Sequence, residues 1–142
     1  MKYKHFLGVI GLLLSIFTLK LFAVPTTITT NNAQVIITAN SETRFGHSVT
    51  FLGTLVQGES PFYAISEPLN KDNGSVYIFQ TSDFSTDLST QNAVVSLNNT
   101  TGTNDEFGLF ITGGGDVDGD GLDDFIITSP RSGKIKLYLG KG

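Results

Sequence analysis

The sequence predicts an all-β fold built from two related units of short antiparallel strands. Runs rich in Val, Ile, Phe, Tyr and Thr are bounded by clusters of Gly, Pro, Asn or Asp, which is typical of strands joined by turns. No segment beyond residue 23 has the 3.6-residue apolar period of an amphipathic helix. The strand-like runs also recur in the same order with the same flanking residues, which indicates an internal duplication.

The first 23 residues have the layout of a secretory signal peptide. Lys2 and Lys4 precede an apolar run at residues 6–19, and Ala23 supplies a small residue at the expected cleavage point. The apolar run is shorter than the roughly 20 residues that span a membrane, so we favour a signal peptide over an uncleaved membrane anchor. We expect a protein that is secreted or held at the cell surface, with no membrane span after signal removal.

The composition excludes some partners and some means of stabilisation. Removing residues 1–23 takes away three of the nine basic residues and none of the thirteen acidic ones, which leaves a net charge of −7. This acidic balance argues against nucleic acid or an anionic membrane as the partner. The chain has no cysteine, so disulfides cannot stabilise an exported form. A bound metal ion is a plausible substitute for such cross-links.

The two units align at an offset of 62 residues. Phe45-Gly46 then falls on Phe107-Gly108, and Pro68 falls on Pro130. In the first unit we predict strands at about residues 34–39, 47–52, 62–66 and 75–80, and in the second at about residues 93–97, 108–112, 124–128 and 134–139. The domain division is 24–80 for the first unit and 81–142 for a linker strand followed by the second unit.

Four antiparallel strands in about sixty residues are typical of one blade of a β-propeller. A propeller closes with about four to eight blades, so two units predict an incomplete propeller. Repeat units do not bury their apolar faces alone. We therefore expect further blades of a parent chain, or self-association, to cover the exposed sheets and edges.

Residues 115–125 hold the densest cluster of acidic side chains in the chain. Carboxylates recur at alternate positions, and four of them are candidate ligands: Asp116, Asp118, Asp120 and Asp124. Leu122 would add its backbone carbonyl oxygen. Such carboxylates repel one another unless a hard cation lies among them, and glycines at 119 and 121 let the backbone curl around that cation. The pattern predicts a calcium site.

Three alternatives to this interpretation differ in their chemistry. An acidic, glycine-rich segment can be a solvated turn, but here it leads directly into the apolar run of a buried strand. An EF-hand needs a Glu at its twelfth position, where this sequence has Ile127. Magnesium prefers few carboxylates and several waters in octahedral geometry. Calcium fits the donor set best.

These residues resemble an FG-GAP repeat, the blade of integrin alpha-subunit propellers and of many bacterial secreted proteins. The resemblance rests on the Phe-Gly pair, the D-x-D-G-D-G-x-x-D pattern, the following strand to Pro130, and a Gly-x-Ile-x-Leu-Tyr strand. It implies that Gly108 permits close approach to a neighbouring blade and that Asp123 is not a ligand and faces solvent. The first unit keeps this framework but has Thr54, Val56, Gly58 and Phe62 in place of the aspartates, so we expect no ion there.

We predict no enzymatic activity. The clustered carboxylates lie in one loop aimed at a common centre, whereas acid–base pairs need unlike environments. His47 has no identifiable nucleophile beside it, because the neighbouring Ser48 points to the opposite face of a strand. The predicted function is a secreted calcium-binding module that contacts proteins or glycans in adhesion. The alternative is a set of accessory blades of a larger secreted enzyme, in which calcium is purely structural.

Overall fold

The computed structural model describes residues 33–39, 43–69, 73–100 and 104–142. These residues form nine strands and three single-turn 3₁₀ helices, and they contain no α-helix. The all-β class predicted from the sequence is therefore confirmed. The predicted signal peptide, residues 1–23, lies outside the described residues. Within the ranges given, no helix is both long enough and apolar enough to cross a membrane.

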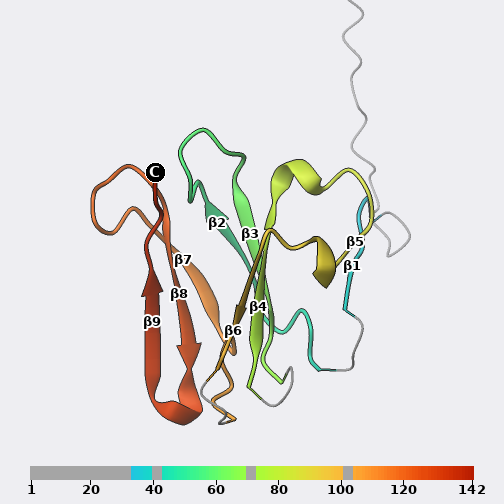
Figure 1. Ribbon diagram of the computed structural model, residues 1–142, viewed down its shortest axis with the longest axis vertical. Coiled ribbons are helices and arrows are strands. Elements are labelled where there is room, and N and C mark those ends of the chain that lie inside the picture. The colour runs from blue at the N-terminus through green and yellow to red at the C-terminus, as the bar shows by residue number, and fades with distance from the viewer. Residues whose placement is uncertain (1–32, 40–42, 70–72, 101–103) are drawn as a thin grey trace, which may run out of the picture.

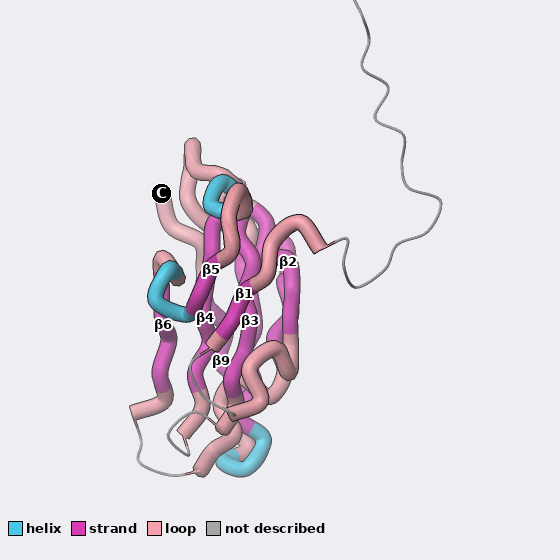
Figure 2. Tube along the Cα trace, turned by 90° about the vertical axis from the view of Figure 1, so that its right-hand side faces the viewer, coloured by secondary structure: helices cyan, strands magenta, loops and turns pink. Residues whose placement is uncertain are grey.

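The strands form three layers. Their bounds are β1 Ile37–Thr38, β2 Val49–Gly53, β3 Phe62–Glu67, β4 Ser75–Gln80, β5 Leu88–Ser89, β6 Val95–Asn98, β7 Ile111–Gly115, β8 Asp124–Ser129 and β9 Lys134–Tyr138. The first sheet has the order β2-β3-β4-β6, the second sheet has the order β7-β8-β9, and β1 pairs with β5 in parallel. Figure 1 places the first sheet between the other two layers, and the side view in Figure 2 agrees.

The burial of individual strands follows this order of layers. Strand β4 lies in the middle layer, and five of its six residues are buried. Strand β9 lies at the edge of the second sheet, and four of its five residues are exposed. Both strands have the β-branched and aromatic residues typical of strands. Their burial therefore reflects their neighbours rather than their composition.

The predicted duplication is present in the hydrogen-bond register of the two sheets. In the first, Val49 is opposite Ile65; in the second, the residues 62 positions later, Ile111 and Ile127, are opposite each other. Both hairpins have a register shift just before the glycine that ends the first strand. Before each hairpin, a non-glycine residue has a positive φ, 63° at Arg44 and 54° at Glu106. The two units thus repeat even in local backbone geometry.

Two strand assignments made from the sequence were wrong. The strand predicted at 93–97 to open the second unit is β6, which pairs with β4 and completes the first sheet. The strand predicted at 34–39 contributes β1, which pairs with β5 instead of joining the first sheet. The second sheet accordingly has three described strands instead of four. An apolar run identifies a strand, but its pairing partner depends on where the intervening loop returns the chain.

The start of β7 also differs from the prediction of 108–112. Strand β7 begins at Ile111 because Phe107 and Gly108 form a turn, closed by a hydrogen bond from the Leu109 N–H to the Glu106 carbonyl. Phe107 is buried and Gly108 has a φ of 84°. A Cβ at Gly108 would lie 2.8 Å from a methyl group of Val76. The predicted close approach to a neighbouring blade is confirmed.

The main core lies between the two sheets. It joins apolar residues of both: Leu52, Leu55, Phe62, Ala64, Val76, Ile78, Phe107, Ile111, Phe125 and Ile127. At its edge Tyr138 stacks on Phe125 with ring centroids 5.0 Å apart, and burial raises the pKa of the Tyr138 hydroxyl. A second cluster on the other face of the first sheet packs against Leu88 and Val35. The first sheet therefore packs against apolar residues on both faces, and the second sheet on one.

Candidate metal centre

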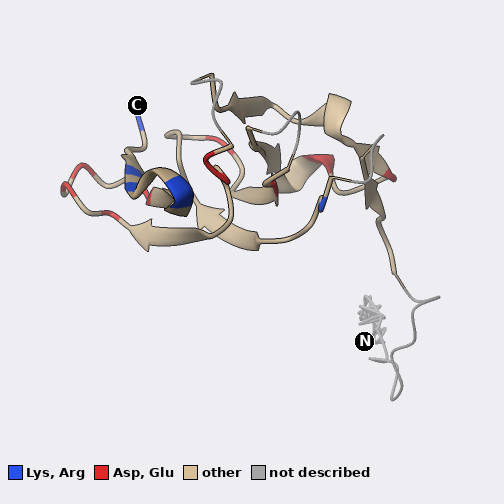
Figure 3. Cartoon of the chain, turned by 90° about the horizontal axis from the view of Figure 1, so that it is seen from below, with Lys and Arg blue, Asp and Glu red and all other residues tan. Residues whose placement is uncertain are grey.

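The predicted acidic ligands lie in the loop between β7 and β8, which we call the Asp loop (residues 116–123). Figure 3 shows acidic positions gathered on a loop that projects from one side of the molecule. Asp116, Asp118 and Asp120 each place a carboxylate oxygen within 4.8 Å of the others, and all three are exposed. Oxygen donors at this spacing suit a hard cation, and carboxylates are the ligands that calcium prefers. The donor set present here fits calcium.

Backbone hydrogen bonds to the carboxylates hold the Asp loop in its curled shape. Asp116 accepts from the N–H groups of Gly119 at 2.6 Å, Asp120 at 3.1 Å and Gly121 at 2.8 Å. Gly119 and Gly121 have φ values of 84° and 90°, which side chains disfavour. The loop thus needs glycine at these two positions to close around Asp116.

Asp124, the fourth predicted ligand, has a different environment. Its side chain is fully buried, and its two oxygens accept from the N–H groups of Val117 at 2.6 Å and Gly140 at 2.9 Å. In the described part of the chain, the group of converging carboxylates does not include Asp124. It is a structural anchor beneath the Asp loop, and its role as a ligand stays a prediction.

Leu122, the predicted carbonyl ligand, anchors the same end of the loop. Its side chain is buried, and its N–H donates to Asp120 at 2.9 Å. A Cβ at Gly140 would lie 2.7 Å from the Leu122 Cβ, so the chain that follows β9 packs directly on this side chain. Packing therefore fixes the backbone at Leu122, while ion binding by its carbonyl stays a prediction.

Asp123 does not face solvent, and the expectation that it does was wrong. Its Oδ2 accepts from the Thr54 N–H at 2.7 Å, and its own N–H donates to the Thr54 carbonyl at 2.8 Å. Thr54 follows β2, so Asp123 connects the Asp loop to the first sheet. No local pattern around Asp123 indicates this contact, because the partner lies 69 positions away in the chain.

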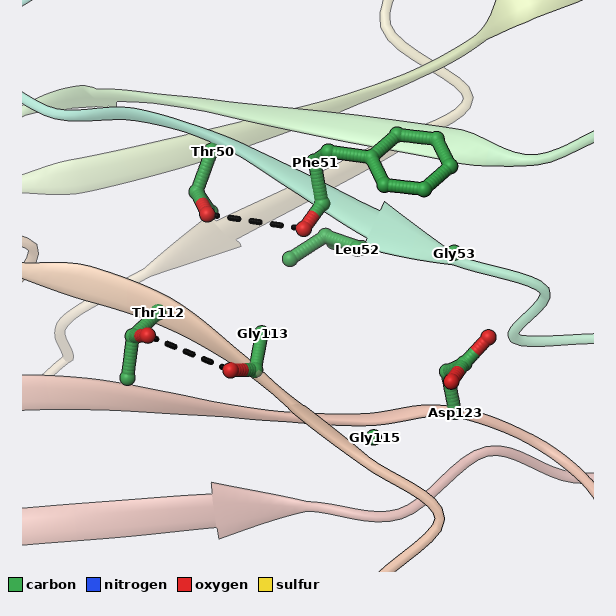
Figure 4. Close-up of a pocket in the computed structure, with 8 residues that line it drawn as sticks. All are labelled: Thr50, Phe51, Leu52, Gly53, Thr112, Gly113, Gly115 and Asp123. Atoms are coloured by element: carbon green, nitrogen blue, oxygen red, sulfur yellow. Dashed lines mark hydrogen bonds between the residues drawn. The ribbon is translucent and has the colours of Figure 1, made fainter.

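Asp123 also lies at the mouth of a cleft between β2 and β7. The cleft has a volume of about 290 Å³ and is lined by residues of these two strands together with Asp123. In Figure 4, Thr50 and Thr112 lie at matching places on the two strands, each donating to the carbonyl of the next residue. Gly113 allows this approach, since a Cβ there would lie 2.8 Å from the Phe51 carbonyl oxygen. The lining offers the hydroxyl groups of Thr50 and Thr112 and the carboxylate of Asp123.

The equivalent loop of the first unit has no comparable carboxylates. It runs from Thr54 to Pro61 between β2 and β3, and Glu59 is its one acidic residue. Among the described residues, the group at Asp116, Asp118 and Asp120 is the one set of three or more His, Cys, Asp or Glu side chains close enough to share a metal ion. The absence of an ion from the first unit stays a prediction.

Comparison with known families bears on the second unit. The family model of the FG-GAP repeat matches residues 107–141, which contain β7, the Asp loop, β8 and β9. No curated protein matched the chain. The predicted resemblance is confirmed for this segment, and the all-β sheets around it agree with a propeller-type arrangement. Residues 107–141 of this chain match the FG-GAP repeat, which agrees with a module of the β-propeller type.

Proposed function

We propose that this protein is an extracellular calcium-binding module of the β-propeller type, which acts by binding rather than by catalysis. The observation that carries the proposal is the convergence of three exposed carboxylates in the Asp loop of an FG-GAP repeat. FG-GAP repeats typically occur in extracellular proteins, where calcium is plentiful and where a chain without cysteine gains from a bound ion.

The carboxylates of Asp116, Asp118 and Asp120 would hold the ion, with Leu122 and Asp124 completing the shell. The positive charge of calcium would offset the repulsion between the three neighbouring carboxylates. Backbone N–H groups of the loop donate to Asp116 and orient it, and the buried Asp124 fixes the end of the loop against the chain that follows β9. Ion binding would therefore stabilise a loop whose shape the chain itself specifies.

The proposed role of the ion is structural, and partner contacts are assigned to the loops around it. Asp123 joins the Asp loop to Thr54 of the first sheet, so the loop is also held by a contact that does not involve the proposed ligands. We assign a protein or glycan as the partner because of the exposed loops and the FG-GAP repeat. A non-enzymatic role is favoured by Ser48, whose hydroxyl accepts from the Ile111 N–H, and by His47, whose ring lies beside Phe110.

Thermal unfolding with and without calcium tests the proposal. Ligand that binds the folded state alone stabilises it by roughly 2.7 kcal/mol at a hundredfold excess over Kd. We expect calcium to raise the melting temperature of the wild type relative to chelator, and magnesium at equal concentration to substitute poorly.

Single substitutions localise the effect. Asp118→Ala and Asp120→Ala should abolish the response to calcium, because each removes a converging carboxylate. Asp123→Ala is the matched control, since it removes a neighbouring carboxylate that bonds to Thr54. It should keep most of the response. A wild-type melting temperature that does not change with calcium would refute the proposed site.

A further inference from the structure

The cleft between β2 and β7 is formed by equivalent parts of the two units. Thr50 and Thr112 occupy the same place in their hairpins, and so do Gly53 and Gly115. Each strand lies at the edge of its own sheet, so no ladder of backbone hydrogen bonds closes the gap between these two described strands. Both walls and the Asp123 end belong to described residues, so the cleft is complete within this chain.

Two hydroxyl groups at one end of the cleft are available to a ligand. Thr50 donates to the Phe51 carbonyl at 3.4 Å and Thr112 donates to the Gly113 carbonyl at 3.2 Å. Both distances are long for a hydroxyl hydrogen bond, so these weak local bonds are readily exchanged for bonds to a ligand. Figure 4 shows the two threonines at one end of the cleft and Asp123 at the other.

The Asp123 end of the cleft carries a negative charge. Asp123 is half-buried, and its Oδ2 accepts from the Thr54 N–H at 2.7 Å. Among the described residues, its Oδ1 has no hydrogen-bond partner, and the one ion pair joins Arg131 to Glu106. No described Lys or Arg lines the cleft. One carboxylate oxygen is therefore open to a cationic ligand.

We infer that this cleft binds a lysine side chain of a protein partner, with the ammonium group at Asp123. An ammonium group is a compact charge with three donors, and it can bond to a single carboxylate oxygen. A guanidinium fits less well, because its bidentate geometry uses both carboxylate oxygens and the Thr54 N–H already bonds to one. The inference rests on the proposed binding role, for which it names the chemistry of the partner.

The size of the cleft and the charge of the chain agree with this ligand. A volume of about 290 Å³ is at the lower limit for small-molecule pockets, so the cleft suits one side chain better than a large ligand. The chain beyond residue 23 has a net charge of −7, which attracts a cationic partner at long range. A neutral glycan would bring hydroxyl groups but no counter-charge for Asp123.

Titration with a blocked lysine, Nα-acetyl-lysine methylamide, tests the site. Nuclear magnetic resonance of the isotope-labelled protein should show saturable shifts of the amide signals at Gly53, Thr54, Gly113 and Gly115. The same compound with its side-chain amine acetylated should cause no such shifts, because acetylation removes the charge. The matching arginine compound should bind more weakly. The shifts should occur both in calcium and in chelator, so failure of the calcium site and failure of the cleft are distinguishable.

Three variants assign the contacts. Asp123→Asn removes the charge but keeps an acceptor for the Thr54 N–H, and it should raise the dissociation constant at least tenfold. Thr50→Val/Thr112→Val removes both hydroxyls and should raise the constant several-fold. Glu59→Gln is the matched control, because it removes an exposed carboxylate outside the cleft, and it should leave the constant unchanged. Melting curves establish that each variant is folded.

The inference is overturned if the wild type shows no saturable shift, whether or not calcium raises its melting temperature. Shifts confined to the Asp loop would also overturn it, because they would place the lysine on the converging carboxylates. Equal binding of the acetylated compound, tighter binding of the arginine compound, or equal weakening by Asp123→Asn and Glu59→Gln would have the same consequence.

Discussion

The loop at residues 54–61 and the Asp loop at residues 116–123 connect the same two strands in their respective units, and they have the same length. Each follows a glycine of positive φ, Gly53 or Gly115, and each precedes a buried residue, Phe62 or Asp124. What differs is how each loop is held. The hairpin framework is therefore common to both loops, and the converging carboxylates are particular to the Asp loop.

The first loop is held by an apolar side chain and by the second sheet. Leu55 is 8 % exposed and belongs to the main core, whereas Val117, its equivalent in the Asp loop, is 56 % exposed. The Leu55 carbonyl also accepts from the Lys141 N–H at 2.9 Å. The Asp loop is held by backbone hydrogen bonds to its own carboxylates, and Asp123 also joins it to Thr54 of the first sheet. One framework thus accommodates an apolar loop that needs no ion and an acidic loop that fits one.

Asp124→Ala should give the largest loss of stability. Asp124 is fully buried, and its removal leaves the N–H groups of Val117 and Gly140 without an acceptor. We expect the free energy of unfolding to fall by about 3–4 kcal/mol, measured by urea unfolding in chelator. Asp124→Asn keeps one acceptor oxygen and should lose about half as much. Equal losses in the two variants would contradict an anchoring role through both oxygens.

Leu55→Ala removes the buried side chain that anchors the loop at residues 54–61. Removing a buried leucine leaves a cavity between the sheets, and we expect a loss of about 2–3 kcal/mol in the same unfolding measurement. The control is Val117→Ala in the Asp loop, where the exposed side chain should cost less than about 0.5 kcal/mol. If the two variants lost similar stability, the two loops would not differ in their anchoring.

Sequence reasoning predicted the strands and the cluster of acidic side chains because both depend on local pattern. Alternating carboxylates, glycines and the following apolar run all lie within residues 116–127, and the structure does bring Asp116, Asp118 and Asp120 together. Pairing between distant segments could not be predicted in the same way. The association of β6 with β4 depends on the path of the chain between them.

The same limit explains the errors at single residues. Asp123 looked like a solvent-facing turn residue because its partner, Thr54, lies in the other unit. Asp124 looked equivalent to the other carboxylates, although its position as the first residue of β8 buries it. A repeat fixes which positions correspond, but neighbouring units decide what each position contacts.

Asp123→Ala tests whether Asp123 contributes to the contact between the two units or to ion binding. It removes the acceptor for the Thr54 N–H, and we expect a loss of about 1–2 kcal/mol. Because this bond joins the two sheets, the loss should be the same in calcium and in chelator. Urea unfolding in both conditions measures it, with Asp123→Asn as the milder control. A loss confined to calcium would instead assign Asp123 to the ion site.

Asp118→Asn should have the smallest effect, and its sign should depend on the ion. In chelator, three carboxylates within 4.8 Å repel one another, so removing one charge should raise the melting temperature by about 1–2 °C at low salt. The Asn oxygen can still accept from the Asp120 N–H, as Asp118 does at 3.2 Å. High salt should erase the gain, since it screens exposed charges. In calcium the same variant should melt below the wild type, because a ligand charge is lost. Glu59→Gln in the first loop, where no carboxylates converge, should show no such reversal between calcium and chelator.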